Sequence, residues 1–177
     1  MHFYFTRHGQ TFWNVSNQIC GATDIGLTEQ GYQQAKTLGE TIRQQYKDID
    51  LILTSPLSRA CETARTISEI TGIPLQAEPR LIEQNFGVYE STPRDSAEFH
   101  EAKKNFCDRF ETGESMLQVA ARIFSLLNDI QKDPDHTVLL VAHNGIARHI
   151  EAYFHSMSNE EFSSFGIQNC EIRRYDF

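Results

Sequence analysis

Short strand-like runs alternate with longer helix-like stretches along this chain, and no other feature constrains its fold as much. Runs rich in β-branched and aromatic residues occur at residues 2–6, 50–54 and 137–142. Between and after them, apolar residues recur every three or four positions, as on the buried face of an amphipathic helix. Strands that alternate with helices form right-handed crossovers and a parallel sheet covered on both faces. The sequence therefore predicts an α/β fold.

Four stretches have the helical period, and several of their ends have matching signals. Thr28 is a good N-cap, Pro56 suits the start of the second stretch, and Gly72 ends it. An apolar stretch near residues 166–175 has no helix after it and is predicted to be an edge strand. The result is a three-layer α/β/α sandwich around a mostly parallel sheet. The expected helices span about 28–46, 57–71, 115–132 and 146–154.

Two segments, residues 7–27 and about 84–113, have no regular pattern. Irregular segments of that length inside a domain are usually binding loops or lids. A chain of 177 residues is long enough to close one sizeable core. We therefore expect a single domain over residues 1–177, with a lid at about 84–113.

Composition excludes several classes of partner. The net charge of −8 argues against nucleic acid and against an anionic membrane, because both bind a basic face. The four cysteines form no C-x-x-C pair, so they predict neither a zinc site nor a disulfide framework. No secretory signal and no apolar run of about 18 residues is visible. These observations predict a cytoplasmic protein without a membrane segment.

Polar side chains follow the predicted strands at the points where the strands end. Arg7 and His8 follow the first strand, Arg59 lies just after the second, and His143 directly follows the third. Ligands of open α/β sheets bind beyond the carboxyl ends of the strands. We therefore expect these four side chains to meet at one edge of the sheet.

Two arginines and two histidines at one point favour an anionic ligand, and phosphate fits best. The guanidinium fork matches phosphate oxygens, and Arg59 would lie in the first turn of a helix, where free N–H groups also favour an anion. A histidine beside two permanent cations is held neutral and keeps a lone pair, so His8 is a candidate nucleophile. A leaving alkoxide needs a proton, which Glu83 could supply, with Glu90 as second choice.

Four separated motifs resemble those of the histidine phosphatase superfamily, the phosphoglycerate-mutase-like family. They are T-R-H-G-Q-T at 6–11, S-P-L-S-R-A-x-x-T-A at 55–64, L-I-E-Q-N-F-G-V-Y-E at 81–90 and V-A-H-N-G at 141–145. The resemblance implies the family's fold and a phosphohistidine intermediate on His8. It implies the catalytic residues His8, Glu83, Arg7, Arg59 and His143. It further implies substrate binding by Arg7, Asn14, Arg59, His143 and Gly145.

Three features depart from the family pattern. Many members have a hydroxyl-bearing residue just before the loop glycine, where this chain has Cys20, and the family's phosphatases often have Glu-Gly where this chain has Glu90-Ser91. The stretch between Glu83 and the last predicted parallel strand is also short beside that of the glycolytic mutases. A short lid should admit water to the phosphorylated intermediate, which favours a phosphatase.

The sequence thus predicts a phosphomonoesterase that acts on small phosphoesters without metal or cofactor. One alternative is a phosphoglycerate-type mutase of the same fold, and another is a non-catalytic phosphate-binding module. The expected partner is a small phosphorylated metabolite, and a homodimer stays open. No metal site is expected, since His149 and His155 do not share a helical face. Arg148, on the last predicted helix, could reach the substrate, but a solvated helix face is the favoured interpretation.

Overall fold

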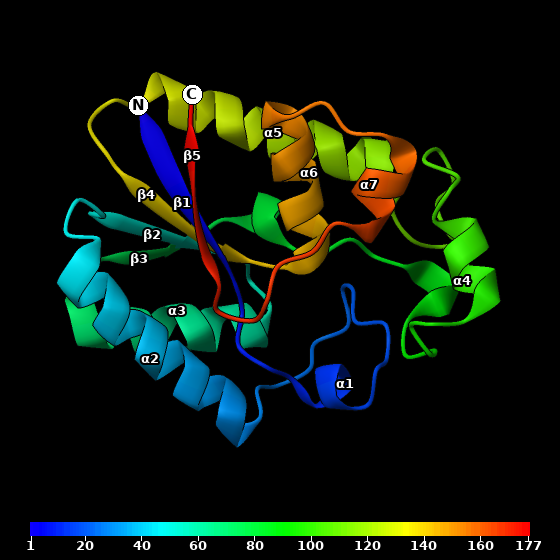
Figure 1. The fold of residues 1–177 in the computed structure, drawn as a ribbon, viewed down its shortest axis with the longest axis horizontal. Helices are drawn as coiled ribbons and strands as arrows, with labels where there is room; N and C mark the ends of the chain where they lie inside the picture. The colour runs from blue at the N-terminus through cyan, green and yellow to red at the C-terminus, as the bar shows by residue number, and fades with distance from the viewer.

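The computed structural model describes all of residues 1–177, which form a five-stranded sheet between two layers of helices (Figure 1). Four strands are parallel and β5 runs antiparallel to β1 at one edge of the sheet. The strand order is β3-β2-β4-β1-β5. The strands are β1 (His2–Arg7), β2 (Leu51–Thr54), β3 (Leu75–Ala77), β4 (Val138–Ala142) and β5 (Ile172–Asp176). The predicted α/β class and the edge strand are confirmed.

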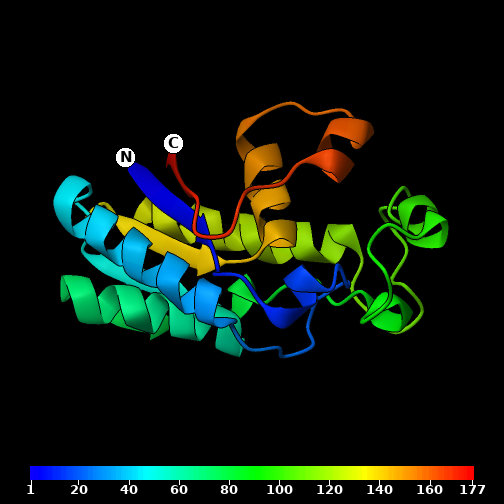
Figure 2. The ribbon, with the colours of Figure 1, turned by 60° about the horizontal axis from the view of Figure 1, so that its bottom comes forward.

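Helices cover both faces of the sheet. One face carries α2 (Glu29–Gln45) and α3 (Ser58–Thr71), which pack against each other, and the opposite face carries α5 (Met116–Lys132) and α6 (Asn144–Phe154). Figures 1 and 2 show these layers, with the two termini close together. The predicted three-layer sandwich is therefore confirmed.

Side-chain alternation along the central strands builds two cores. Phe3 and Phe5 of β1 are fully buried among the side chains of α5 and α6, whereas Tyr4 between them packs on the α2 and α3 side. In β4, Leu140 joins the first core, and its neighbour Leu139 joins the second. Because both faces of β4 are covered, that strand is apolar throughout, as is typical of parallel sheets.

Helix ends agree with the sequence signals to within one or two residues. The Thr28 hydroxyl caps α2 by accepting a hydrogen bond from the Gly31 amide at 3.1 Å. Gly72 ends α3 with a φ of 77°, a left-handed conformation that glycine adopts without strain. Two helix starts differ from the expectation: α3 begins one residue later, at Ser58, and α6 begins two residues earlier, at Asn144.

The two segments without a sequence pattern contain short helices rather than continuous loop. Residues 7–27 include α1 (Phe12–Val15), and residues 84–113 include the 3₁₀ helix η2 (Gly87–Tyr89) and α4 (Ala97–Ala102). We call residues 84–113 the lid segment. The 3₁₀ helix η1 (Pro79–Leu81), α7 (Asn159–Ser164) and β3 complete the fold.

The lid segment has a small core of its own. Phe86, Phe99 and Phe110 pack around Ile19, which comes from the first irregular segment. Ile19 is 2% exposed, so the two segments are joined by a buried contact. This cluster lies beside the carboxyl ends of the strands and positions the lid segment over that edge. No helix of the chain combines the length and the apolar character that crossing a bilayer requires.

Candidate active site

The carboxyl ends of β1 and β4 lie side by side and place two histidines together. Arg7, the last residue of β1, pairs in register with Ala142, the last residue of β4. His8 and His143 follow these positions, and their ring centroids are 5.2 Å apart. His143 is also the N-cap residue of α6. The meeting of these side chains follows from the parallel register.

His8 is held in one tautomer. Its Nδ1 lies 2.7 Å from the carbonyl oxygen of Gly9, which can only accept, so Nδ1 carries the proton and Nε2 keeps its lone pair. Burial, followed by the charges of Arg59 and Arg7, lowers the pKa of His8 well below its usual value. The ring is therefore neutral at neutral pH, with a nucleophilic nitrogen available.

His143 is fully buried and has one ring nitrogen to spare. The Ser55 hydroxyl accepts from the Leu57 amide at 3.3 Å and lies 2.7 Å from Nε2 of His143, to which it can donate its own proton. Nδ1 of His143 has no partner in the protein. Burial, reinforced by Arg59, lowers the pKa of His143 well below its usual value. A neutral ring with Nδ1–H unpaired suits a ligand oxygen.

Arg59 is fully buried and Arg7 is half-buried, and each has a buried Nε donor without a partner. Arg7 donates through Nη1 to the Ile167 carbonyl at 2.9 Å, and burial followed by the charge of Arg94 lowers its pKa to about 10. Arg59 donates to the carbonyls of Gly21 at 2.7 Å and Thr23 at 2.9 Å, which fixes the loop before α2. The Nε atoms of both arginines have no partner. Buried donors of this kind normally have an acceptor, and an anion would supply it.

Glu83 is held by the first turn of α6. Its Oε2 accepts from the Gly145 amide at 2.9 Å, and its Oε1 accepts from the Gln84 amide, also at 2.9 Å. The carboxylate is 5% exposed and lies against Gly145, where a Cβ would overlap Oε1. Gly145 therefore allows the carboxylate to approach the helix, and its amide orients it.

Gly145→Ala tests this close approach. The added methyl group would displace the Glu83 carboxylate, and a displacement of about 1 Å in a catalytic group can cost about 100-fold in rate. Crowding of this kind also typically costs about 1–3 kcal/mol of stability. Turnover assays and thermal melts would show both effects. Gly26→Ala is the control, because nothing lies within 4 Å of a Cβ at that position; equal activity of the two variants would contradict the assignment.

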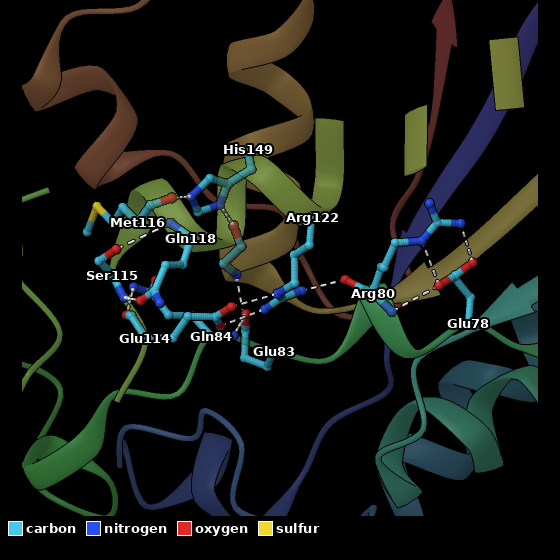
Figure 3. A network of polar contacts seen from close by, with 11 residues as sticks. Glu78, Arg80, Glu83, Gln84, Glu114, Ser115, Met116, Gln118, Arg122 and His149 are labelled. Carbon is cyan, nitrogen blue, oxygen red and sulfur yellow. Dashed lines mark hydrogen bonds and ion pairs between the residues drawn. The ribbon is translucent and has the colours of Figure 1, made fainter. Parts of the chain in front are cut away.

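A polar network surrounds Glu83 (Figure 3). Arg122 grips the Glu114 carboxylate with two hydrogen bonds of 2.8 Å and also donates to the Arg80 carbonyl. The Gln84 amide group donates to the Glu114 carbonyl at 2.9 Å. The chain on both sides of Glu83 is thereby anchored to α5, which restricts the movement of the carboxylate.

Asn14 lies at the other side of the cavity, in α1. Its Oδ1 accepts from the Thr11 amide at 3.0 Å and from the Asn169 side chain at 3.4 Å. The same Asn169 side chain donates to the His8 carbonyl at 2.7 Å. Since Oδ1 is occupied, the amino group of Asn14 is the part available to a ligand.

Glu90 has a different position from Glu83. Its carboxylate accepts from the amides of Gly21, Ala22 and Thr23 at 2.9–3.3 Å, so it closes the loop that Arg59 also holds. Glu83, and not Glu90, lines the cavity. Ser91, where the family often has glycine, has a φ of 67°, so the left-handed backbone is kept without glycine.

A cavity of about 540 Å³, counting its open mouth, joins these groups. Of the sequence-predicted residues, the cavity wall includes Arg7, His8, Asn14, Glu83 and Gly145. Arg59 and His143 do not line it, because both are fully buried. The charge of Arg59 lowers the pKa of His8, and the His143 ring packs beside the His8 ring.

Three further cations line the cavity, and the sequence reasoning missed them. Arg94 and Lys103 come from the lid segment, and Arg148 comes from α6. The expectation of a solvated face at Arg148 was wrong, because the chain after α7 covers that face and Arg148 Nε donates to the Phe165 carbonyl at 2.9 Å. The one sequence signal for this position is the helical period of α6, which places Arg148 one turn after Gly145 on the same face of the helix.

Acid should destabilise the fold through three buried histidines. Burial is the main cause that lowers the pKa of His8 and His143, and it lowers that of His149 to about 4. Below the unfolded value of about 6.5, the unfolded chain binds protons that the folded chain cannot, so stability falls as pH falls. At about 1.4 kcal/mol per pH unit for each group, the loss from pH 7 to 5.5 reaches about 4 kcal/mol.

Urea unfolding at the two pH values measures this loss. The pKa of exposed His136 is raised by its hydrogen bond to Asp133, so this residue weakly stabilises the fold as the pH falls. An unfolding free energy that stays constant between pH 7 and 5.5 would contradict the neutral state of the buried rings.

The fold and cavity together define a class: an α/β protein with a cationic pocket, suited to a small anion, at the carboxyl ends of its parallel strands. No group of three or more histidine, cysteine or acidic side chains is arranged to hold a metal ion. The sequence model of the histidine phosphatase superfamily (branch 1) matches residues 3–177. The chain belongs to that superfamily.

Relatives within this superfamily carry names of two kinds. The chain is 31% identical over 182 residues to "Probable phosphoglycerate mutase GpmB" of Yersinia pestis, a match that covers 98% of this chain and 84% of the relative. Its structure resembles a mycobacterial glucosyl-3-phosphoglycerate phosphatase complexed with VO3 (TM-score 0.85, 27% identity, 98% and 90% of the two chains). It also resembles a phosphoserine phosphatase from Entamoeba histolytica in complex with 3-phosphoglyceric acid (TM-score 0.84, 26% identity, 99% and 90%).

Proposed function

We propose that this protein is a phosphomonoesterase that hydrolyses small phosphoesters through a phosphohistidine on His8. One observation carries the proposal: the Nδ1 proton of His8 is fixed on the Gly9 carbonyl, which leaves Nε2 free in a cationic cavity that also contains Glu83. A neutral imidazole nitrogen beside bound phosphate is a competent nucleophile. Membership of the histidine phosphatase superfamily supports the same chemistry.

In the first step, Nε2 of His8 attacks phosphorus and the bond from phosphorus to the ester oxygen breaks. Arg7, whose unpaired Nε–H group lies at the cavity wall, stabilises the charge on the phosphoryl oxygens, Arg59 adds its positive charge from behind the wall, and His143 supports the His8 ring. The amino group of Asn14 adds a donor from the opposite side. Glu83, in its protonated form, gives its proton to the departing alcohol.

In the second step, water attacks the phosphohistidine and Glu83 takes a proton from it. His8 is released with its lone pair restored, inorganic phosphate leaves, and Glu83 is protonated for the next cycle. The Gly145 and Gln84 amides orient the carboxylate for both roles. No step requires a metal ion.

Hydrolysis is favoured over mutase activity by access of water. His8 and Glu83 are buried side chains, but they line a cavity whose mouth is open to solvent. A mutase must hold its released ester away from water while the ester turns, which a closed site favours. Two of the structural neighbours named above are phosphatases. The curated relative is named as a mutase, so isomerisation of phosphoglycerate is the second candidate.

The two candidates are separated by incubating the protein with 3-phosphoglycerate and with a panel of sugar phosphates, with EDTA present throughout. The proposal predicts release of inorganic phosphate. Conversion to 2-phosphoglycerate without free phosphate would identify a mutase, whereas no reaction with any ester would leave a phosphate-binding module.

A further inference from the structure

The first turn of α6 holds the Glu83 carboxylate, yet this turn lacks a side-chain cap. Its N-cap residue, His143, makes no side-chain hydrogen bond to the helix. Gly145, whose amide donates to Glu83, has no side chain to pack, and glycine has the greatest backbone freedom of any residue. Helix ends fray unless other groups hold them. Proton transfer by Glu83 therefore depends on the contacts that fix the backbone at Gly145.

His149 lies one turn further along α6 and makes such a contact (Figure 3). Its Nδ1 lies 2.8 Å from the Gly145 carbonyl oxygen, and its Nε2 lies 3.1 Å from the carbonyl oxygen of Met116, the first residue of α5. Burial lowers the pKa of His149 to about 4, so the ring is neutral and has one N–H group. Both carbonyls can only accept. The shorter contact assigns the proton to Nδ1, which donates to Gly145.

The His149 ring is itself held in place by packing. It is 3% exposed and lies edge-on to the Phe162 ring of α7, with the two centroids 5.1 Å apart. Its Nε2 edge lies against the first turn of α5, which has a complete capping box between Ser115 and Gln118. The ring thus joins the start of α6, which has no side-chain cap, to the well-capped start of α5.

The contacts around the general acid form a closed circuit. The Glu83 carboxylate accepts from the Gly145 amide, and the imidazole ring links Gly145 to Met116. Two residues before Met116, the Glu114 carbonyl accepts from the side chain of Gln84 at 2.9 Å, and Gln84 directly follows Glu83. A displacement of the backbone at Gly145 would therefore move the carboxylate relative to its own main chain.

We propose that His149 is a positioning residue for the general acid: its Nδ1–H group holds the Gly145 carbonyl and thereby orients the amide that directs the Glu83 carboxylate toward the leaving group. This inference rests on the proposed phosphatase function. His149 does not line the cavity, so it acts through Gly145 and Glu83 and not through the substrate. Its removal should therefore affect proton transfer and leave phosphoryl binding unchanged.

His149→Asn and His149→Gln separate the two ring nitrogens. The amide nitrogen of asparagine is as many bonds from the backbone as Nδ1, and that of glutamine is as many as Nε2. We expect His149→Asn to keep kcat/KM for glycerol 3-phosphate within about threefold of the wild type, and His149→Gln to lower it about 10- to 100-fold, because a shift of about 1 Å in a catalytic group has a cost of this order. For p-nitrophenyl phosphate, whose leaving group departs without a proton, both variants should stay within about threefold.

His155→Gln is the matched control, because His155 is exposed at the other end of α6 and the same change there should leave both esters unaffected. Thermal melts check that each variant is folded. Should His149→Gln not fold, His149→Phe takes its place with the same expectation, since it keeps a ring against Phe162 and lacks the donor. In a Glu83→Gln background, the change at His149 should alter kcat/KM for glycerol 3-phosphate by less than about twofold, because the acid it positions is already missing.

Hydrogen exchange of the Gly145 amide tests the contact without any reaction. We expect exchange about 10-fold faster in His149→Gln than in the wild type and in His149→Asn, as the loss of one hydrogen bond allows. Equal exchange in the two variants, or equal losses on the two esters, would overturn the positioning role and leave the phosphatase standing. No phosphate release from either ester by the wild type would refute the phosphatase, and the exchange rates would still decide whether His149 holds Gly145.

Discussion

His8→Ala is expected to abolish phosphate release from every phosphoester, with a fall in turnover of about 10⁴-fold or more. The variant lacks the only nitrogen positioned to accept the phosphoryl group, and losses of this size are typical when a covalent nucleophile is removed. The remaining cations still bind substrate, so affinity for inorganic phosphate should change much less than turnover. A sensitive phosphate assay and a binding titration measure the two effects separately.

The control for His8→Ala is His136→Ala. His136 is exposed, lies before β4 at the opposite end of that strand from His143, and does not line the cavity. Thermal melts of both variants check that each is folded. Retention of more than about one-hundredth of wild-type turnover by folded His8→Ala would rule out His8 as nucleophile.

Glu83→Gln has the second largest expected effect, and the effect should depend on the leaving group. The amide oxygen can still accept from Gly145, but the side chain can no longer give or take a proton. We expect kcat/KM for an alkyl phosphoester such as glycerol 3-phosphate to fall about 10²- to 10⁴-fold. For p-nitrophenyl phosphate, whose leaving group departs without a proton, the fall in kcat/KM should be within about 10-fold.

This contrast separates proton transfer from a purely structural role of Glu83. The ratio kcat/KM reports on steps up to formation of the phosphoenzyme, so slow hydrolysis of that intermediate does not mask the result. Equal losses on the alkyl and nitrophenyl esters would show that Glu83 holds the backbone near Gly145 and does not protonate the leaving group.

Local patterns predicted the parts of the fold and site that depend on short stretches of chain. The strand and helix periods gave the layers, and the parallel arrangement of β1 and β4 placed His8 beside His143 because both follow strands at paired ends. Glu83 was also located by its place at the end of an apolar run. These inferences used the general rule that ligands bind at the carboxyl ends of parallel strands, without knowledge of which strands pair.

The remainder depends on contacts that a single sequence does not reveal. The lid segment folds around Ile19, which lies more than sixty residues away in the chain, so the positions of Arg94 and Lys103 follow from that packing and not from local propensity. Arg148 was misplaced because a helix period does not show that the chain around Phe165 covers its face. The three-residue strand β3 was missed because it is too short for a period to be recognised.

The most direct test of the account is to trap the phosphorylated enzyme. Glu83→Gln should form the intermediate from p-nitrophenyl phosphate and hydrolyse it slowly, because the base that activates water is missing. After a rapid quench under alkaline conditions, mass spectrometry is predicted to show one added phosphoryl group, on the peptide that contains His8, with a matching burst of nitrophenol. Steady turnover with no adduct, or an adduct on another residue, would contradict a mechanism through phosphohistidine at His8.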